Sequence, residues 1–329
     1  MSDWMKPVVP VYSYLAEEQG ISEDEPEIET GSETEGMTGI SKADVPEERN
    51  IGLNKKEAET EIVTAEVVSN RISPALRQQL NDFDYLISNY YTVDGGTAAD
   101  EVLFDTEKLL SMDLSLLQNP EVPQILIYHT HSQEAFVDSR EGMTEDTIVG
   151  MGEVLAKHLR GYGYQVIHDT GTYDLVDGVL DRSSAYDYAR EAVEQILKKY
   201  PTIEVIVDLH RDGVDGTKFV TEIGGKPTAK IMFFNGLSRD AQMQELSWLP
   251  NENLIDNLAF SLQMELLARE LYPDFTRNIY LKAERFNLHL RPRSLLIEAG
   301  TQLNTVEEER NAMEPLAELI YQVLSGVKQ

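Results

Sequence analysis

Two histidines and a glutamate follow a short apolar stretch near the middle of the chain. Residues 124–136 read QILIYHTHSQEAF and carry His129, His131 and Glu134 directly after a run of aliphatic side chains. Imidazoles and a carboxylate at the carboxyl end of a buried strand are a common way to hold a metal ion at the rim of an α/β sheet. The spacing therefore indicates a metal site whose remaining ligands come from the ends of other strands.

Two further predicted strands end in residues of the same kind. The segment IEVIVDLH ends in His210, and SLLIEAG carries Glu298. Because parallel α/β sheets keep their sites at one edge, we expect both side chains to lie beside the first cluster. Two imidazoles and one carboxylate leave a tetrahedral zinc ion one open position for water. Glu298, which follows three aliphatic residues, suits the role of a carboxylate that is not a ligand and takes the proton of that water.

The ligands of the first cluster are not fully determined by the pattern. We expect only one of His129 and His131 to face the site, and we favour His131 as the ligand, with His129 hydrogen-bonded behind it or in the core. Glu134 is the favoured carboxylate ligand. Glu145, at the start of the following predicted helix, is the alternative, although acidic residues also suit a helix start by charge alone.

Three neighbouring residues are candidates for binding the substrate or supporting the ligands. Arg211 and Asp212 directly follow His210, where they could orient that histidine, bind a carboxylate or form a surface pair. His289 lies a short loop before the strand that carries Glu298, which favours a position near the substrate.

Composition restricts the function further. The 329-residue chain has no cysteine, so its metal ligands must be His, Asp or Glu, and no disulfide can form. A formal net charge of −30 argues against nucleic acid as a partner, because the phosphates would be repelled. We see neither an apolar stretch of about 18 residues, as a membrane helix needs, nor the basic and apolar start of an export signal.

Three regions differ in character. Residues 1–70 carry 17 acidic and 5 basic side chains, and we expect this acidic segment to be largely disordered. Residues 71–122 predict a helical lead-in packed on the main domain, with Leu76, Leu80, Phe83 and Leu86 as one helical stripe. Residues 123–329 are the predicted catalytic domain.

Alternating strands and helices from Pro123 onward predict an α/β fold with a mostly parallel twisted sheet and helices on both faces. Two strand-like segments flanking Gly224-Gly225 add a β-hairpin insertion, and a long helix is expected over residues 254–271. Thr305 and Glu308 predict a capping box for the last helical region, which Pro315 is expected to break in two.

Four segments together resemble one family. They are YHTHSQEAF, AYDYAREAVEQILKKYPTIEVIVDLHRDG, AKIMFFNG and RFNLHLRPRSLLIEAGTQLNTVEEE. In this order they are similar to the stage II sporulation protein P family, cell-wall hydrolases related to the zinc N-acetylmuramoyl-L-alanine amidases. The resemblance covers roughly residues 82–317 and leaves the acidic N-terminal segment outside.

The resemblance implies an enzyme that uses zinc to hydrolyse the amide between N-acetylmuramic acid and the L-alanine of the stem peptide, with a second activity against peptide cross-links. It implies action on peptidoglycan during engulfment in sporulation, alongside the sporulation protein D lytic transglycosylase. By motif, His131 and His210 match zinc ligands and Glu298 matches the catalytic glutamate. The family is usually tethered to the membrane and faces the wall, but no signal or transmembrane segment is visible here. The alternatives are a zinc peptidase acting on stem peptides and a catalytically silent wall-binding scaffold.

Overall fold

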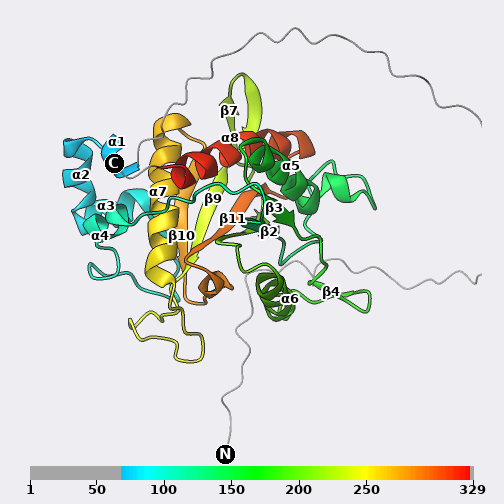
Figure 1. The fold of residues 1–329 in the computed structure, drawn as a ribbon, viewed down its shortest axis with the longest axis horizontal. Coiled ribbons are helices and arrows are strands. Elements are labelled where there is room, and N and C mark those ends of the chain that lie inside the picture. The colour runs from blue at the N-terminus through cyan, green and yellow to red at the C-terminus, as the bar shows by residue number, and fades with distance from the viewer. Residues whose placement is uncertain (1–67, 327–329) are drawn as a thin grey trace, which may run out of the picture. The chain divides into compact units, whose positions relative to one another are not determined.

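A seven-stranded sheet runs through the part of the chain that the computed structural model describes, residues 68–326 (Figure 1). Its strand order is β1-β10-β9-β11-β6-β2-β3. The strands are β1 (Tyr91–Val93), β2 (Ile125–Tyr128), β3 (Val166–His168), β6 (Val205–Asp212), β9 (Ile231–Gly236), β10 (Thr276–Lys282) and β11 (Arg293–Thr301). Every neighbouring pair is parallel except β9 and β11, which are antiparallel. The predicted mostly parallel α/β sheet is confirmed.

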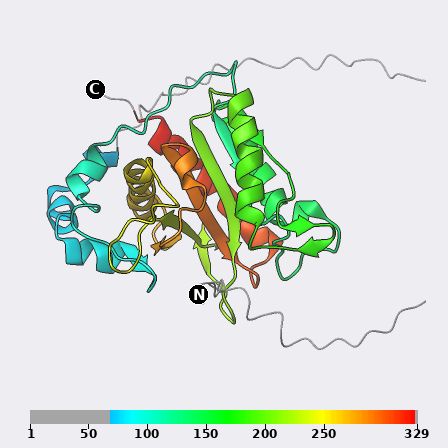
Figure 2. The ribbon, with the colours of Figure 1, turned by 90° about the horizontal axis from the view of Figure 1, so that it is seen from below.

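The two faces of the sheet are covered by different helices. Alternate residues of the central strands, such as Leu126 and Ile206, pack on α6 (Ala185–Lys199), as the two-residue period of a strand requires. Their chain neighbours face the larger core, which includes α5 (Ile148–Gly161), α7 (Leu254–Leu271) and α8 (Val306–Leu324). Seen from below, the sheet lies between α7 and α6 (Figure 2). The predicted helices on both faces are therefore present, and the long helix over residues 254–271 is confirmed.

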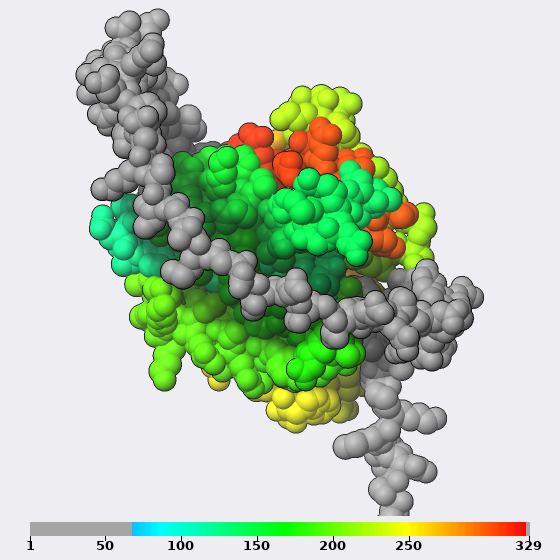
Figure 3. Space-filling view, turned by 90° about the vertical axis from the view of Figure 1, so that its right-hand side faces the viewer, coloured from blue at the N-terminus to red at the C-terminus, as the bar shows by residue number. Residues whose placement is uncertain are grey.

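The predicted hairpin is also present. Strands β7 (Val220–Ile223) and β8 (Lys226–Ala229) are antiparallel around Gly224-Gly225, both of which have positive φ. The hairpin packs along α8 and stands out from the body of the domain beside it (Figure 3). The chain then enters the main sheet as β9. A second hairpin precedes α6 and consists of two strands of two residues each, β4 (Leu175–Val176) and β5 (Val179–Leu180).

The region before the first central strand is more divided than the helical stripe predicted. It forms α1 (Val68–Arg71), α2 (Pro74–Leu80), α3 (Phe83–Tyr90), β1 and α4 (Thr106–Ser111). Asp82 accepts a hydrogen bond from the backbone N–H of Tyr85 and caps α3, which ends the preceding helix. The residues Tyr91–Val93 extend the sheet beside β10. The predicted acidic, disordered segment over residues 1–70 lies almost wholly outside the described residues.

The C-terminal helix both confirms and corrects the sequence prediction. Thr305 and Glu308 form the expected capping box. The predicted break at Pro315 is wrong, because α8 continues through it from Val306 to Leu324. A proline inside a helix costs about 3 kcal/mol or more. Fully buried apolar side chains on both sides of Pro315, including Met313 and Leu316, offset that cost by holding both turns against the core.

Candidate metal centre

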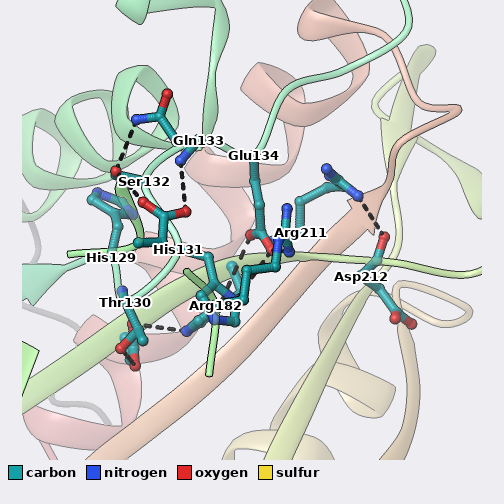
Figure 4. A network of polar contacts seen from close by, with 12 residues as sticks. His129, Thr130, His131, Ser132, Gln133, Glu134, Arg182, Arg211 and Asp212 are labelled. Atoms are coloured by element: carbon teal, nitrogen blue, oxygen red, sulfur yellow. Dashed lines mark hydrogen bonds and ion pairs between the residues drawn. The ribbon is translucent and has the colours of Figure 1, made fainter. Parts of the chain in front are cut away.

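The loop after β2 carries His131 and Glu134, and hydrogen bonds to two buried aspartates hold this loop in place. The backbone N–H and the hydroxyl of Thr130 donate to Asp208 on β6, at 2.9 and 2.6 Å. The hydroxyl of Ser132 donates to the buried Asp174 at 2.8 Å. These bonds fix the two ends of a short turn, from which His131 and Glu134 point toward β6 (Figure 4).

His131, Glu134 and His210 form a compact buried group. Each offers one ligand atom, and these atoms lie within 4.8 Å of one another. The Glu134 carboxylate lies between the rings, with Oε1 at 3.5 Å from His131 Nδ1 and Oε2 at 3.8 Å from His210 Nδ1. The two imidazole rings are perpendicular, with centroids 5.1 Å apart. His131 and Glu134 come from one segment of the sequence and His210 from another, and the structure brings the two segments together.

Glu134 is held by groups on both sides. The backbone N–H of Arg211 donates to Oε2 at 2.8 Å, and the guanidinium of Arg182 donates to Oε1 at 3.3 Å. Burial alone would raise the pKa of the Glu134 carboxyl, but its contacts with His131 and His210 outweigh this and lower the pKa to about 2. The carboxyl is therefore ionised, as a metal ligand must be.

Glu298 lies next to this group on the neighbouring strand. In the parallel pairing of β11 with β6, Glu298 is the register partner of His210, so both side chains lie on the same face. Burial raises the pKa of the Glu298 carboxyl to about 8, with the nearby acids adding to the effect and His210 opposing it. Its Oε2 has no hydrogen-bond partner among the described residues. A buried carboxyl with a free oxygen and a raised pKa is suited to exchange a proton.

The electrostatics of the group favour a cation. Burial would lower the pKa of His210, yet Asp208, followed by Glu134 and Glu298, raises it to about 10. Asp208 Oδ1 lies 2.8 Å from His210 Nε2, which is the carboxylate–histidine arrangement found behind many metal ligands. A buried set of two imidazoles and one carboxylate that attracts positive charge fits a zinc ion in donor chemistry as well as in charge.

Two of the residues weighed from the sequence lie elsewhere. His129 is fully buried, but its Nδ1 is 2.8 Å from the carbonyl oxygen of Leu209 and its Nε2 is 3.0 Å from His168 Nε2, so neither nitrogen points to the group. Glu145 is exposed and pairs with Arg140 at 3.6 Å. Both are outside the ligand group because their polar atoms have other partners.

The three supporting candidates have different positions. Arg211 contributes its backbone N–H to Glu134, while its guanidinium reaches the carbonyl oxygen of Asp212 at 3.4 Å. Asp212 pairs with Arg277 at 2.6 Å. His289, on the short 3-10 helix η3 (Leu288–Leu290), makes no contact with the group; burial lowers its pKa to about 4, with Arg285 adding to the effect.

Sequence reasoning missed three residues that touch the group. Asp208 interrupts the apolar run VIVDL before His210, and a carboxylate buried in such a strand needs a partner, so the sequence did carry a signal for it. Tyr186, at the start of α6, stacks on His210 with centroids 6.2 Å apart and meets His131 edge-on at 5.5 Å. Arg182 comes from an irregular loop, where spacing gives no signal.

Comparison with known proteins identifies the family. The family model of stage II sporulation protein P matches residues 12–321. The chain belongs to the stage II sporulation protein P family. The match begins well before the resemblance seen from the motifs and includes most of the acidic segment. Stage II sporulation protein P of Bacillus subtilis (strain 168) is 24% identical over 210 residues, which cover 59% of this chain and 49% of that protein. The matched stretch thus spans about half of that relative.

Solved structures with a similar chain path include two amidases. N-acetylmuramoyl-L-alanine amidase AmiC2 of Nostoc punctiforme is 13% identical, with a TM-score of 0.36, covering 63% of this chain and 97% of that one. The apo form of the N-acetylmuramyl-L-alanine amidase Ami1 of Mycobacterium abscessus is 14% identical, with a TM-score of 0.35, covering 61% and 97%. Similarity at this level says nothing about activity. Within residues 68–326, no helix is both long and apolar enough to cross a membrane.

Proposed function

We propose that this chain is a zinc-dependent peptidoglycan hydrolase that cleaves the amide between N-acetylmuramic acid and the L-alanine of the stem peptide. The observation that carries the proposal is the buried group of His131, Glu134 and His210 with Glu298 directly beside it. Membership of a sporulation protein family supports the choice of peptidoglycan as substrate.

Each residue has a distinct task in this proposal. His131, Glu134 and His210 hold the zinc ion, which when bound polarises the amide carbonyl and lowers the pKa of a water molecule. Asp208, whose Oδ1 lies 2.8 Å from His210 Nε2, orients that ring so that its Nδ1, 3.8 Å from Glu134 Oε2, is the nitrogen offered to the metal.

Glu298 moves the protons of the reaction. Its Oε2 accepts a proton from the attacking water and delivers it to the nitrogen of the leaving L-alanine. The bond between the carbonyl carbon and that nitrogen breaks, which leaves a carboxylate on the muramoyl group and a free amine on the peptide. Burial raises the pKa of the Glu298 carboxyl, which favours its binding the proton of the water before delivering it to the leaving nitrogen.

The substitution Glu298→Gln tests the assignment of roles. It removes the base but no ligand, so we expect zinc to remain bound near one ion per chain while release of stem peptides from purified sacculi is lost. Retained hydrolysis would remove Glu298 from the mechanism. Absence of zinc and of hydrolysis in the wild-type chain would favour the wall-binding scaffold.

Family membership also supports a working location and partner as part of the proposal. We place the protein on the wall-facing side of a membrane during engulfment, acting beside the sporulation protein D lytic transglycosylase. Co-purification of the two proteins from sporulating cells, compared with cells lacking the transglycosylase, tests this partner. This experiment tests the partner alone, and the proposal of peptidoglycan as the substrate does not depend on its outcome.

A further inference from the structure

Four aromatic side chains form a continuous row that begins at the candidate metal centre. Tyr186 contacts the rings of His131 and His210. Beyond it, the centroids of Tyr186 and Phe286 are 5.3 Å apart, those of Phe286 and Phe234 are 5.0 Å apart, and those of Phe234 and Tyr280 are 5.3 Å apart. All four side chains are half-buried, and neither hydrophobic core includes any of them.

The row lies on the face of the sheet that carries the catalytic groups. Tyr280 pairs in register with Phe234, and Phe234 pairs with Leu296, two residues before Glu298 on β11. Side chains two apart on a strand share a face, so Phe234 and Glu298 lie on the same side of the sheet. Helix α6 covers this face over β2 and β6, where its core contains Leu126 and Ile206. Over β9 and β10 the same face carries the aromatic rings of Phe234 and Tyr280.

Phe286 is held in the row by a backbone that few bulky residues adopt. It and Asn287 have φ of 48° and 60°, in the left-handed region, which is a genuine outlier for an aromatic residue. The Asn287 side chain donates to the carbonyl oxygen of Tyr186 at 2.8 Å, which ties the turn to α6. A Cβ at Gly236 would lie 1.8 Å from the carbonyl oxygen of Glu284, so only glycine lets the turn approach β9 this closely.

Strained backbone of this kind persists only where surrounding structure imposes it, and it concentrates at ligand sites. Asn257 on α7 supplies such support, because its side-chain N–H donates to the carbonyl oxygen of Leu288 at 2.5 Å. The short helix η3 and its preceding turn therefore present Phe286 at a fixed place between Tyr186 and Phe234.

We propose that Tyr186, Phe286, Phe234 and Tyr280 form a platform for the sugar rings of the glycan strand whose muramoyl amide lies at Glu298. The inference rests on the proposed function and names the part of the substrate that this face holds. Pyranose rings present C–H groups on their faces, and aromatic faces attract such groups while excluding water. The acidic stem peptide fits this face less well, because the hydroxyl of Tyr280 already donates to the carboxylate of Asp94 at 3.0 Å, which leaves an acid at this end of the row.

Binding of the N-acetylglucosamine tetramer, followed by NMR titration, tests the platform without requiring hydrolysis. The variant Phe234→Leu keeps an apolar side chain of similar size and removes the ring, so we expect the fold to persist and the tetramer affinity to fall about tenfold. Tyr280→Leu gives the same test from β10. Tyr188→Ala is the matched control, because Tyr188 is exposed on the same helix as Tyr186 and lies outside the row.

A second readout uses the reaction. We expect Phe234→Leu to lower the ratio of hydrolysis rates on long glycan strands to those on muramoyl dipeptide, while Tyr188→Ala leaves that ratio unchanged. No tetramer binding by the wild-type chain, or equal affinity in wild type and both row variants, overturns the platform. Row-dependent tetramer binding in a chain that hydrolyses nothing would instead overturn the proposed function and leave the platform standing.

Discussion

Two pairs of buried histidines lie close together in this protein and have opposite surroundings. His129 and His131 are two residues apart in the chain, yet each contacts a different second histidine. His129 meets His168 through their Nε2 atoms, 3.0 Å apart, and its Nδ1 contacts the carbonyl oxygen of Leu209. The ring of His131 instead faces that of His210, with Glu134 between their Nδ1 atoms.

The difference teaches that neighbouring charge, and not burial, separates a structural histidine from a candidate ligand. Burial lowers the pKa of His129 to about 3, and the adjacent His168 adds to the effect. Burial also opposes the charged form of His210, but Asp208 and Glu134 raise its pKa to about 10. The first pair is thus satisfied as neutral rings, whereas the second attracts a cation.

The largest difference between the two pairs is expected when one histidine of each pair is replaced. We expect His210→Ala to lose the metal and to lower the hydrolysis rate by more than about 100-fold, the upper end of the loss caused by partners behind a ligand. His129→Ala should keep the metal and lose about 1–3 kcal/mol of unfolding free energy, because it leaves the Leu209 carbonyl without a donor. Metal content by mass spectrometry and thermal unfolding separate the two results. Equal metal loss in both variants would contradict the assignment.

The carboxylates behind the two pairs give the next largest contrast. Asp208→Asn weakens the partner of His210 Nε2, so we expect zinc affinity, measured by competition with a chelator, to fall about 10–100-fold. The matched variant is Glu153→Gln, since Glu153 contacts His168 at 3.0 Å but not the ligand group. It should leave zinc affinity unchanged. A loss in Glu153→Gln as large as in Asp208→Asn would show that the two pairs are not independent.

A buried acid away from both pairs isolates the effect of burial. Burial raises the pKa of Glu265, on α7, from 4.5 to about 7 against the lowering effect of Arg269. The folded state then binds the Glu265 proton more tightly than the unfolded state does. The protonated carboxyl therefore adds to the free energy of unfolding below pH 4.5, and this gain is lost as the pH rises to about 7. Relative to Glu265→Gln, the wild-type chain should lose about 3 kcal/mol across this window. If the unfolding free energies of the two proteins changed in parallel with pH, the expected pH dependence would be contradicted.

The smallest expected effect concerns the packing of the structural pair. A Cβ at Gly152 would lie 2.4 Å from His129 Nε2 and 2.6 Å from His168 Nε2. Gly152→Ala should therefore cost about 2 kcal/mol of unfolding free energy through overpacking, with zinc content unchanged. Gly161→Ala, in the same helix but with open space around its Cβ position, is the control. Equal stability of the two variants would show that the histidine pair tolerates displacement.

Much of the fold followed from short apolar runs. The aliphatic residues before His129, His210 and Glu298 predicted three strands, and the parallel order of β2, β6 and β11 brings their carboxyl ends to one edge. The capping box at Thr305 followed from local chemistry. Pro315 was misjudged because its cost is local, whereas the packing that offsets it comes from residues distant in sequence.

The sequence indicated that His131, Glu134 and His210 belong together, but it did not indicate the contacts that surround them. His131 and His129 have the same type and nearly the same position, and only their partners on other elements distinguish them. Tyr91–Val93 continues a helical segment in sequence, so its pairing with β10 depended on a strand almost two hundred residues away. Arg182 lies in an irregular loop and Tyr186 at the start of a helix, so neither stood in the spacing of histidines and acids that indicated the group.

The most direct test of the account is the product of sacculus digestion with and without metal. Purified sacculi are treated with the wild-type chain, with the chain after chelation, and with the chelated chain supplied with zinc, and the products are identified by mass spectrometry. The account predicts free stem peptides that begin with L-alanine, lost on chelation and restored by zinc. Undiminished release after chelation, or products cut only within the cross-links, would contradict it.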